Sequence, residues 1–96
     1  ITGGGFYENI PRMMKDGLTA KIELAQLPKL PVFGLLQKAG NIPERDMYNT
    51  FNMGMGMCIA VAAEDADTAV RCLTENGEKA FCIGEVVKGE EGVVLC

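Results

Sequence analysis

The sequence predicts an α+β fold, in which a mixed sheet of about four strands carries helices packed on it. Two periodicities indicate this class. Apolar residues recur at i, i+3, i+4 and i+7 in Val32–Ala39 and Ala66–Leu73, as on one face of a helix. They alternate with other residues over Ala20–Leu24 and Met53–Ala63, as in strands. The 96 residues fit one small domain, residues 1–96, and the apolar fraction of 48% can supply a core.

The first helix is predicted to start within Gly3–Gly5 and to run to about Ile10. Pro11 then disfavours helical geometry in the residue before it and predicts a break or tight turn. The next strand, Ala20–Leu24, is predicted to be half open to water. The helix after it has one predicted buried stripe, made of Val32, Leu35, Leu36 and Ala39, and Gly40 is placed to end it.

A short helix is predicted after Pro43, with Met47 and Phe51 on its inner face. Large and small residues alternate strictly in Met53–Ala63, which predicts a strand buried on both sides. The large face consists of Met53, Met55, Met57, Ile59 and Val61.

Glu64 or Asp65 is expected to cap the last helix, and Asn76-Gly77 to close it. Its predicted inner stripe is Ala66, Ala69, Val70 and Leu73. Phe81–Val87 and Val93–Leu95 are predicted to form a hairpin. The strand–helix–strand–strand ending suits an α+β sheet with helices packed on it, and the fold is expected to be partly ferredoxin-like.

Composition argues against several functions. The net charge is −4 without a run of either sign, which disfavours a nucleic-acid surface and an anionic membrane surface. The longest apolar stretch is too short to span a bilayer. The spacings of the four cysteines are unlike a zinc site, and Cys58, Cys72 and Cys82 lie within apolar patterns, where a free Cys behaves as a small hydrophobe. This favours reduced thiols in a cytoplasmic protein, with a disulfide or metal role as the alternative. No His is present, so the commonest general base and metal ligand is missing.

The glycine turn Gly3–Gly5 is the first candidate site. A helix start presents unpaired N–H groups and partial positive charge, and glycine lets an anion approach the backbone closely. Thr2 adds a hydroxyl donor, and Asn9 and Arg12 lie one to two turns further on. The alternative is a helix start that needs room against another element.

The second candidate is Tyr48–Met57, which places polar side chains before the bare face of a predicted strand. Asn52 either bonds the backbone there or binds a ligand amide, and a simple helix-to-strand turn is the alternative. The methionines are read as core residues. Glu8 and Glu44 are read as helix-start or solvent-facing charges. No Ser or Cys has a His to activate it, so we expect no catalytic residue and no metal site in this chain.

Together the two segments resemble the aminoimidazole ribonucleotide (AIR) synthetase family, also called phosphoribosylformylglycinamidine cyclo-ligases. Ile1–Gly5 followed by Glu8–Arg12 is similar to one family landmark, and Met47–Met57 matches a second in order and spacing. The stretches around Pro31–Asn41 and Ala80–Val86 are also similar. The resemblance covers essentially the whole chain but only the tail of the family's proteins, so the chain is expected to be a piece of a longer protein, part of its C-terminal domain.

This resemblance implies an ATP-dependent ring closure in purine biosynthesis, which converts formylglycinamidine ribonucleotide to aminoimidazole ribonucleotide with release of ADP and phosphate. It implies that the family's N-terminal domain supplies most ATP and Mg²⁺ contacts and the main interface of a homodimer. Phosphoryl transfer depends on positioning and charge stabilisation more than on a protein nucleophile. The residues assigned to substrate and phosphate binding are Thr2, Gly3, Gly4, Gly5, Asn9, Asn52, Gly54 and Gly56.

Two other functions remain open. The chain could be a non-catalytic module that binds a metabolite at its glycine turn, or a structural dimerisation module. In every case the isolated chain is expected to be inactive as a cyclo-ligase. An uncovered sheet edge is expected to make it self-associate.

Overall fold

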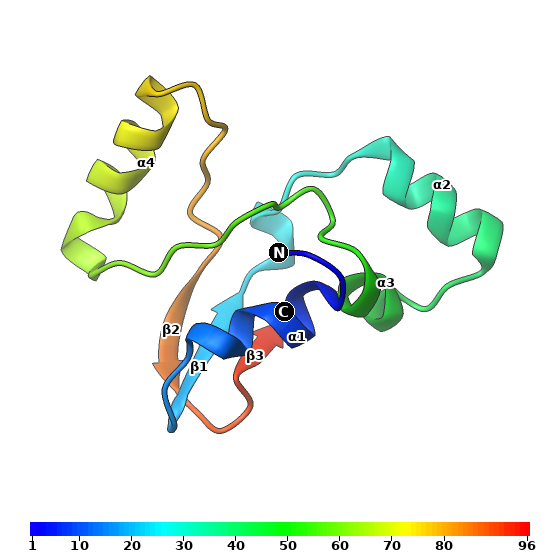
Figure 1. Cartoon of the computed structure of the whole chain (residues 1–96), viewed down its shortest axis with the longest axis horizontal. Helices are drawn as coiled ribbons and strands as arrows, with labels where there is room; N and C mark the ends of the chain where they lie inside the picture. The colour runs from blue at the N-terminus through cyan, green and yellow to red at the C-terminus, as the bar shows by residue number, and fades with distance from the viewer.

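The computed structural model describes residues 1–96 and confirms the α+β class (Figure 1). Three short 3₁₀ turns lie at Ile10–Met13, Leu24–Gln26 and Ala63–Asp65. The helices and strands, in chain order, are α1 (Gly5–Asn9), β1 (Leu18–Ile22), α2 (Pro31–Gly40), α3 (Glu44–Thr50), α4 (Ala66–Glu75), β2 (Gly84–Lys88) and β3 (Val93–Leu95).

The sheet is mixed and has three strands in the order β2-β1-β3. Ala20 of β1 lies opposite Val86 of antiparallel β2 and opposite Val93 of parallel β3. The predicted hairpin of the last two strands is therefore wrong, because β1 lies between them. The buried Thr19 side chain anchors the connecting loop, since its Oγ1 accepts from the Glu91 amide at 3.3 Å.

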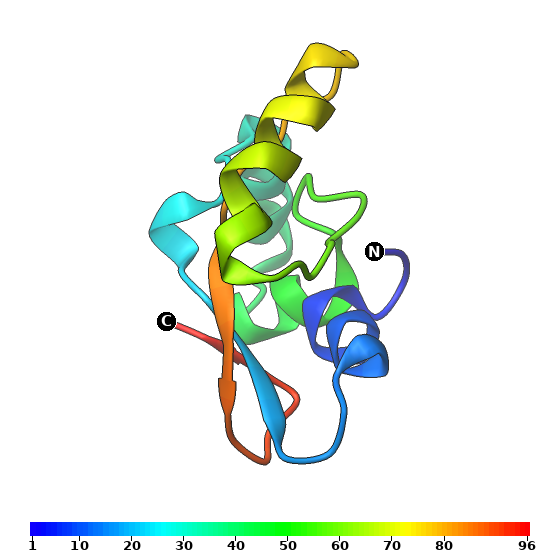
Figure 2. The same cartoon turned by 90° about the vertical axis from the view of Figure 1, so that its left-hand side faces the viewer.

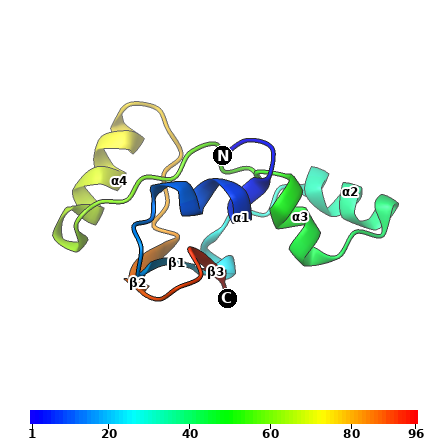
Figure 3. The ribbon, with the colours of Figure 1, turned by 60° about the horizontal axis from the view of Figure 1, so that its bottom comes forward.

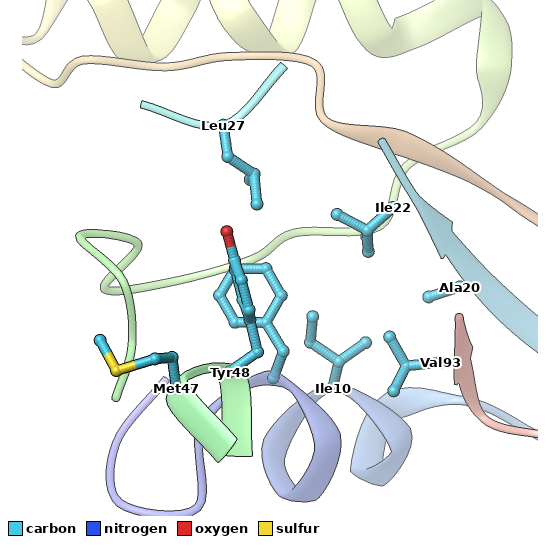
Figure 4. Close-up of a cluster of buried hydrophobic side chains, with 8 residues drawn as sticks. Ile10, Ala20, Ile22, Leu27, Met47, Tyr48 and Val93 are labelled. Carbon is cyan, nitrogen blue, oxygen red and sulfur yellow. The ribbon is translucent and has the colours of Figure 1, made fainter. Parts of the chain in front are cut away.

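The core lies between this sheet and α1, which crosses one face of it, with α3 alongside (Figure 3). Ile10 points toward the sheet residues, and the Phe6 and Tyr48 rings meet edge to face at 5.5 Å (Figure 4). Such an edge-to-face pair adds about 0.5–1.5 kcal/mol beyond its area burial. The buried apolar residues are Phe6, Ile10, Ala20, Ile22, Leu27, Met47, Tyr48 and Val93.

The first helix follows its prediction. It begins at Gly5 and changes to a 3₁₀ turn at Ile10, with Pro11 in the first turn of that segment. The strand after it starts and ends two residues earlier than predicted, because Leu24 begins a 3₁₀ turn. Its alternation is correct, with Ile22 buried and Lys21 exposed.

The predicted buried stripe of α2 is wrong. Val32, Leu35 and Leu36 are 50%, 68% and 40% exposed, and α2 has no buried residue. The helix itself forms from local signals, with Pro31 in its first turn and Asn41 at a left-handed C-cap where Gly40 was expected. Its inner face is instead the half-buried pair Phe33 and Gln37. The Phe33 ring lies 6.0 Å from that of Phe51. Helix α2 therefore contacts the core through Phe33, which is not part of the predicted apolar stripe.

The predicted strand Met53–Ala63 is also wrong, and its absence reduces the sheet from four strands to three. The segment crosses from α3 to α4 without a neighbouring strand to pair with (Figure 1). Met57, Ile59 and Val61 are 76%, 57% and 46% exposed, so most of the large face is not buried. Only Met53 and Met55 of that face are half-buried against the core. The ferredoxin-like arrangement stays a prediction.

The last helix confirms its periodicity: its half-buried residues are Ala66, Ala69, Val70 and Leu73, and the rest of α4 is exposed. Asn76 caps it, and Gly77 follows in a left-handed conformation. Asp65 is the N-cap residue, although its side chain makes no capping bond. This helix projects away from the core (Figure 2), on the opposite side from α2 (Figure 1). The next strand, β2, starts three residues later than predicted, and Phe81 is 46% exposed.

Candidate functional site

The glycine turn starts α1 in a conformation that favours glycine. Gly4, the N-cap residue, has φ 95° and Gly5 has φ 62°, both in the left-handed region. The Gly5 amide donates to the Thr2 carbonyl at 3.1 Å. The amides of Gly3 and Gly4 donate to no group of the chain. Of the three amides predicted to bind an anion, those of Gly3 and Gly4 are therefore free, whereas that of Gly5 is bonded inside the turn.

Gly5 is required by packing. It is buried, and a side chain there would meet the backbone carbonyls of Tyr48 and Phe51, with the Phe51 oxygen only 2.8 Å from a Cβ. Helix α1 thus closely approaches the end of α3. For Gly5 this is the alternative given above, a helix start that needs room against another element. Gly3 differs, because nothing lies within 4 Å of a Cβ added there.

Asn9 folds back over the turn. Its Nδ2 donates to the carbonyls of Gly5 at 2.8 Å and Gly3 at 3.2 Å, and its Oδ1 accepts from the Thr2 hydroxyl at 3.3 Å. The predicted pair Thr2 and Asn9 is thus brought together. The Asn9 side chain holds the backbone of the turn, and the Thr2 hydroxyl holds the Asn9 side chain.

Asn49 connects the turn to α3. Its Nδ2 donates to the Gly4 carbonyl at 3.3 Å and to Glu8 Oε2 at 2.8 Å. The Glu8 carboxylate also stands beside Gly4, where it would meet an added Cβ at 2.8 Å. Glu8 is therefore a bonded member of the turn and not only a solvent-facing charge.

The second motif forms a tight turn. The Met55 amide donates to the Asn52 carbonyl at 2.9 Å, and the central residues Met53 and Gly54 have φ 54° and 93°, as in a type I′ turn. Asn52 Oδ1 accepts from the Gly54 amide at 2.9 Å. Of the two roles considered for Asn52, the structure shows the backbone bond. Gly54 faces Leu30, whose Cδ1 would lie 2.7 Å from an added Cβ.

The two motifs adjoin at the start of the chain. The amino group of Ile1 donates to the Gly56 carbonyl. Gly56 therefore lies beside the glycine turn, while Gly54 faces α2.

A hollow of about 530 Å³ opens between α1, α3 and β3. The Arg45 guanidinium stacks over the Tyr7 ring at 4.0 Å on its wall, and Asn49 and Glu8 also line it. Neither Arg45 nor Asn49 was among the site residues predicted from the sequence. Asn49 lay within the second motif, but nothing in the spacing of Arg45 marks it.

Two groups have shifted pKa values. Burial raises the pKa of Tyr48 above its ordinary value of 10.0, and the negative charge of Glu44 adds to this. Burial also raises the pKa of the Cys58 thiol, while the nearby N-terminal amino group acts in the opposite direction. Both groups are thus held in their neutral forms.

All four cysteines are free thiols, and Cys72 and Cys82 are exposed, which corrects their interpretation as small hydrophobes within apolar patterns. Only half-buried Cys58 packs against the core. No three His, Cys, Asp or Glu side chains gather where a metal ion could be held. No helix has the length and apolar character needed to cross a membrane.

The fold and these two adjoining motifs define a small α+β domain with a glycine turn held between two helices. The chain belongs to the family described as AIR synthase related protein, C-terminal domain, whose model matches residues 1–96.

Three curated relatives are named phosphoribosylformylglycinamidine cyclo-ligase. Those of Lachnoclostridium phytofermentans and Acetivibrio thermocellus are 54% and 55% identical over 96 residues, all of this chain. That of Bifidobacterium longum subsp. infantis is 51% identical over 95 residues, 99% of this chain. The match covers 28% of each relative's own length.

Proposed function

We propose that this chain is part of an ATP-dependent cyclo-ligase of purine biosynthesis, which converts formylglycinamidine ribonucleotide to aminoimidazole ribonucleotide. Its identity of about 55% with relatives named for that activity supports this. The structural observation that carries the proposal is the pair of hydrogen bonds from Asn49 to the Gly4 carbonyl and to Glu8, which joins the two family landmarks into one wall. In the proposal, the chain is part of the C-terminal domain of a cytoplasmic homodimer.

The wall would contact substrate phosphate through Gly3 and Gly4, because their amides have no partner within the chain. Thr2 and Asn9 would hold the turn in shape. The Glu8 carboxylate beside Gly4 repels an anion, so the phosphate would lie on the exposed Gly3 side of the turn. Gly5 would act through packing, and Asn52, Gly54 and Gly56 would form the adjoining wall.

ATP and Mg²⁺ would be bound mainly by the part of the relatives that this chain does not span. The acidic side chains here do not gather into a ligand set for a hard cation. When bound, Mg²⁺ would neutralise charge on the transferred phosphoryl group. The role of this chain is to position the substrate, and the isolated chain would have no turnover.

A chimera tests the proposal. This chain replaces the matching segment of the Acetivibrio thermocellus relative, and phosphate release is measured with formylglycinamidine ribonucleotide and ATP. We expect substrate-dependent release from the chimera and none from the isolated chain. A folded chimera without activity, or turnover by the isolated chain, would contradict the proposal.

Two matched variants locate the wall. Asn9→Ala in the chimera removes the clamp on the glycine turn and should raise the KM for the ribonucleotide. Gln37→Ala removes a similar bond, from Gln37 Nε2 to the Ile42 carbonyl at 3.1 Å, away from the turn, and should leave that KM unchanged. Equal effects of the two variants would remove the glycine turn from the site.

The non-catalytic metabolite-binding or dimerisation module remains the alternative. Phosphate release by the chimera distinguishes the two, because a non-catalytic module would not support turnover. Amide chemical shifts of the isolated chain, followed during titration with formylglycinamidine ribonucleotide, test where the ligand binds. The cyclo-ligase proposal expects Gly3 and Gly4 to move, with exposed Gly77 as an unmoved reference. Movement confined to Met47–Phe51 would contradict it.

A further inference from the structure

Asn76 and Gly77 end helix α4 at the surface, where both residues are exposed. Asn76 is the C-cap residue, and Gly77 follows it with φ 90°. The Gly77 amide donates to the Thr74 carbonyl at 3.1 Å. The Glu78 amide donates to the Leu73 carbonyl at 3.0 Å, and the two bonds together form a Schellman motif.

This helix end also contains a reactive pair of residues. Asn76 is the only asparagine of the chain that precedes a glycine. Glycine has no side chain to shield its backbone nitrogen, so the Gly77 nitrogen has open access to the side-chain amide of Asn76. The other four asparagines precede Ile, Thr or Met, whose side chains hinder such an approach. Backbone attack on a side-chain amide is therefore least obstructed at Asn76.

We propose that Asn76 is a site of spontaneous deamidation, and that this reaction releases the C-terminal turn of α4. The Gly77 nitrogen attacks Asn76 Cγ, so that a bond between these two atoms forms and the bond from Cγ to Nδ2 breaks. Nδ2 leaves as ammonia with the proton of the Gly77 amide. Water then opens the resulting succinimide ring at one of its two carbonyls and leaves aspartate or isoaspartate at position 76.

The folded helix end slows this reaction. The Gly77 amide is bonded to the Thr74 carbonyl, and Asn76 Nδ2 donates to the Cys72 carbonyl at 2.8 Å. Both bonds must break before the ring can close, so only the opened turn reacts. Opening is local, because α4 has no buried residue and projects away from the core (Figure 2).

The product cannot rebuild the helix end. An aspartate side chain has no N–H to donate to the Cys72 carbonyl. Its negative charge also lies at the C-terminus of a helix, where the dipole is already negative. Isoaspartate in addition adds a methylene group to the backbone, which alters the spacing between Thr74 and the Gly77 amide. Each conversion therefore leaves the last turn of α4 more open than before.

Peptide mapping by mass spectrometry, after incubation of the chain in warm, mildly alkaline, reducing buffer, tests the site. Asn76 should be converted to aspartate and isoaspartate. Asn41 is the matched control, because it is also an exposed C-cap residue, at the end of α2, but precedes Ile42. It should stay intact.

Gly77→Ala separates chemical access from opening of the turn. The added methyl group has no atom within 4 Å, but it strains a backbone with φ 90° and so favours the opened turn. It also shields the attacking nitrogen. The conversion of Asn76 should therefore become slower in this variant, whereas opening alone would make it faster.

Three measurements test the protection. Conversion of Asn76 should be at least about tenfold slower in the folded chain than in concentrated urea, because only the opened turn reacts. Urea below the unfolding transition should leave the rate nearly unchanged, since opening one turn exposes little surface. After conversion, the amides of residues 73–78 should exchange with solvent faster, and those of α3 should not.

Several outcomes would overturn the proposal. They are an unreacted Asn76, conversion of Asn41 at the same rate, and faster conversion in Gly77→Ala. Equal rates in the folded chain and in concentrated urea, a rate that follows global unfolding, or unchanged exchange at the end of α4 would do so as well. No substrate enters these tests, so they are independent of the proposed enzyme function.

Discussion

The side-chain amide of Asn49 on α3 donates to the carboxylate of Glu8 on α1 at 2.8 Å, across 41 residues of sequence. The same nitrogen donates to the Gly4 carbonyl. One side chain thus ties the glycine turn and the first helix to the helix that begins the second motif. The two landmarks of the sequence are therefore parts of one packed unit.

This bond predicts a coupling between the two residues. Asn49→Ala and Glu8→Ala, alone and combined, form a double-mutant cycle measured by urea unfolding. We expect a coupling free energy of about 1 kcal/mol, because the bond involves a charged acceptor but is open to solvent. Additive effects of the two substitutions would show that the Glu8 contact contributes nothing to stability.

Gly5→Ala should destabilise the fold strongly. The residue has φ 62°, and an added Cβ would meet the carbonyl oxygen of Phe51 at 2.8 Å. Left-handed strain and a backbone clash together should cost at least about 2 kcal/mol. Gly3→Ala is the matched control, since it adds the same methyl group with nothing within 4 Å, and should stay within about 0.5 kcal/mol. Equal unfolding free energies for the two variants would refute the packing role of Gly5.

The sequence predicted the elements that local signals determine. Pro11 marked the end of α1, and the Ala66–Leu73 spacing identified the inner face of α4. It failed where a partner element decides the outcome. Alternation in 53–63 describes a strand only if another strand pairs with it, and the sheet order depends on β1, which comes much earlier in the chain.

The candidate site shows the same division. Adjacent glycines predicted an unusual turn, which Gly4 and Gly5 form. Spacing alone could not show that Gly5 is buried against α3, or that Asn9 bonds back to the turn. Long-range contacts such as the Asn49 bond have no local signal in a single sequence.

Alkaline pH should destabilise the protein through Tyr48. Burial raises its pKa above 10.0 in the folded state, so the folded state binds this proton more tightly than the unfolded chain. The resulting stability is complete below pH 10 and is lost as pH rises from there through the folded pKa. Tyr48→Phe should remove this part of the pH dependence in urea unfolding. An unchanged alkaline slope in the variant would exclude Tyr48 as its source.

The Cys58 thiol should react more slowly than the other three. Burial raises its pKa above 9.0, whereas Cys72, Cys82 and Cys96 are exposed. Because the thiolate is the nucleophile, modification by a disulfide reagent at mildly alkaline pH should show one slow thiol, about tenfold slower or more. Cys58→Ser should abolish the slow phase, and urea should bring all four thiols to one fast rate. A slow phase that survives in Cys58→Ser would place the protected thiol elsewhere in the fold.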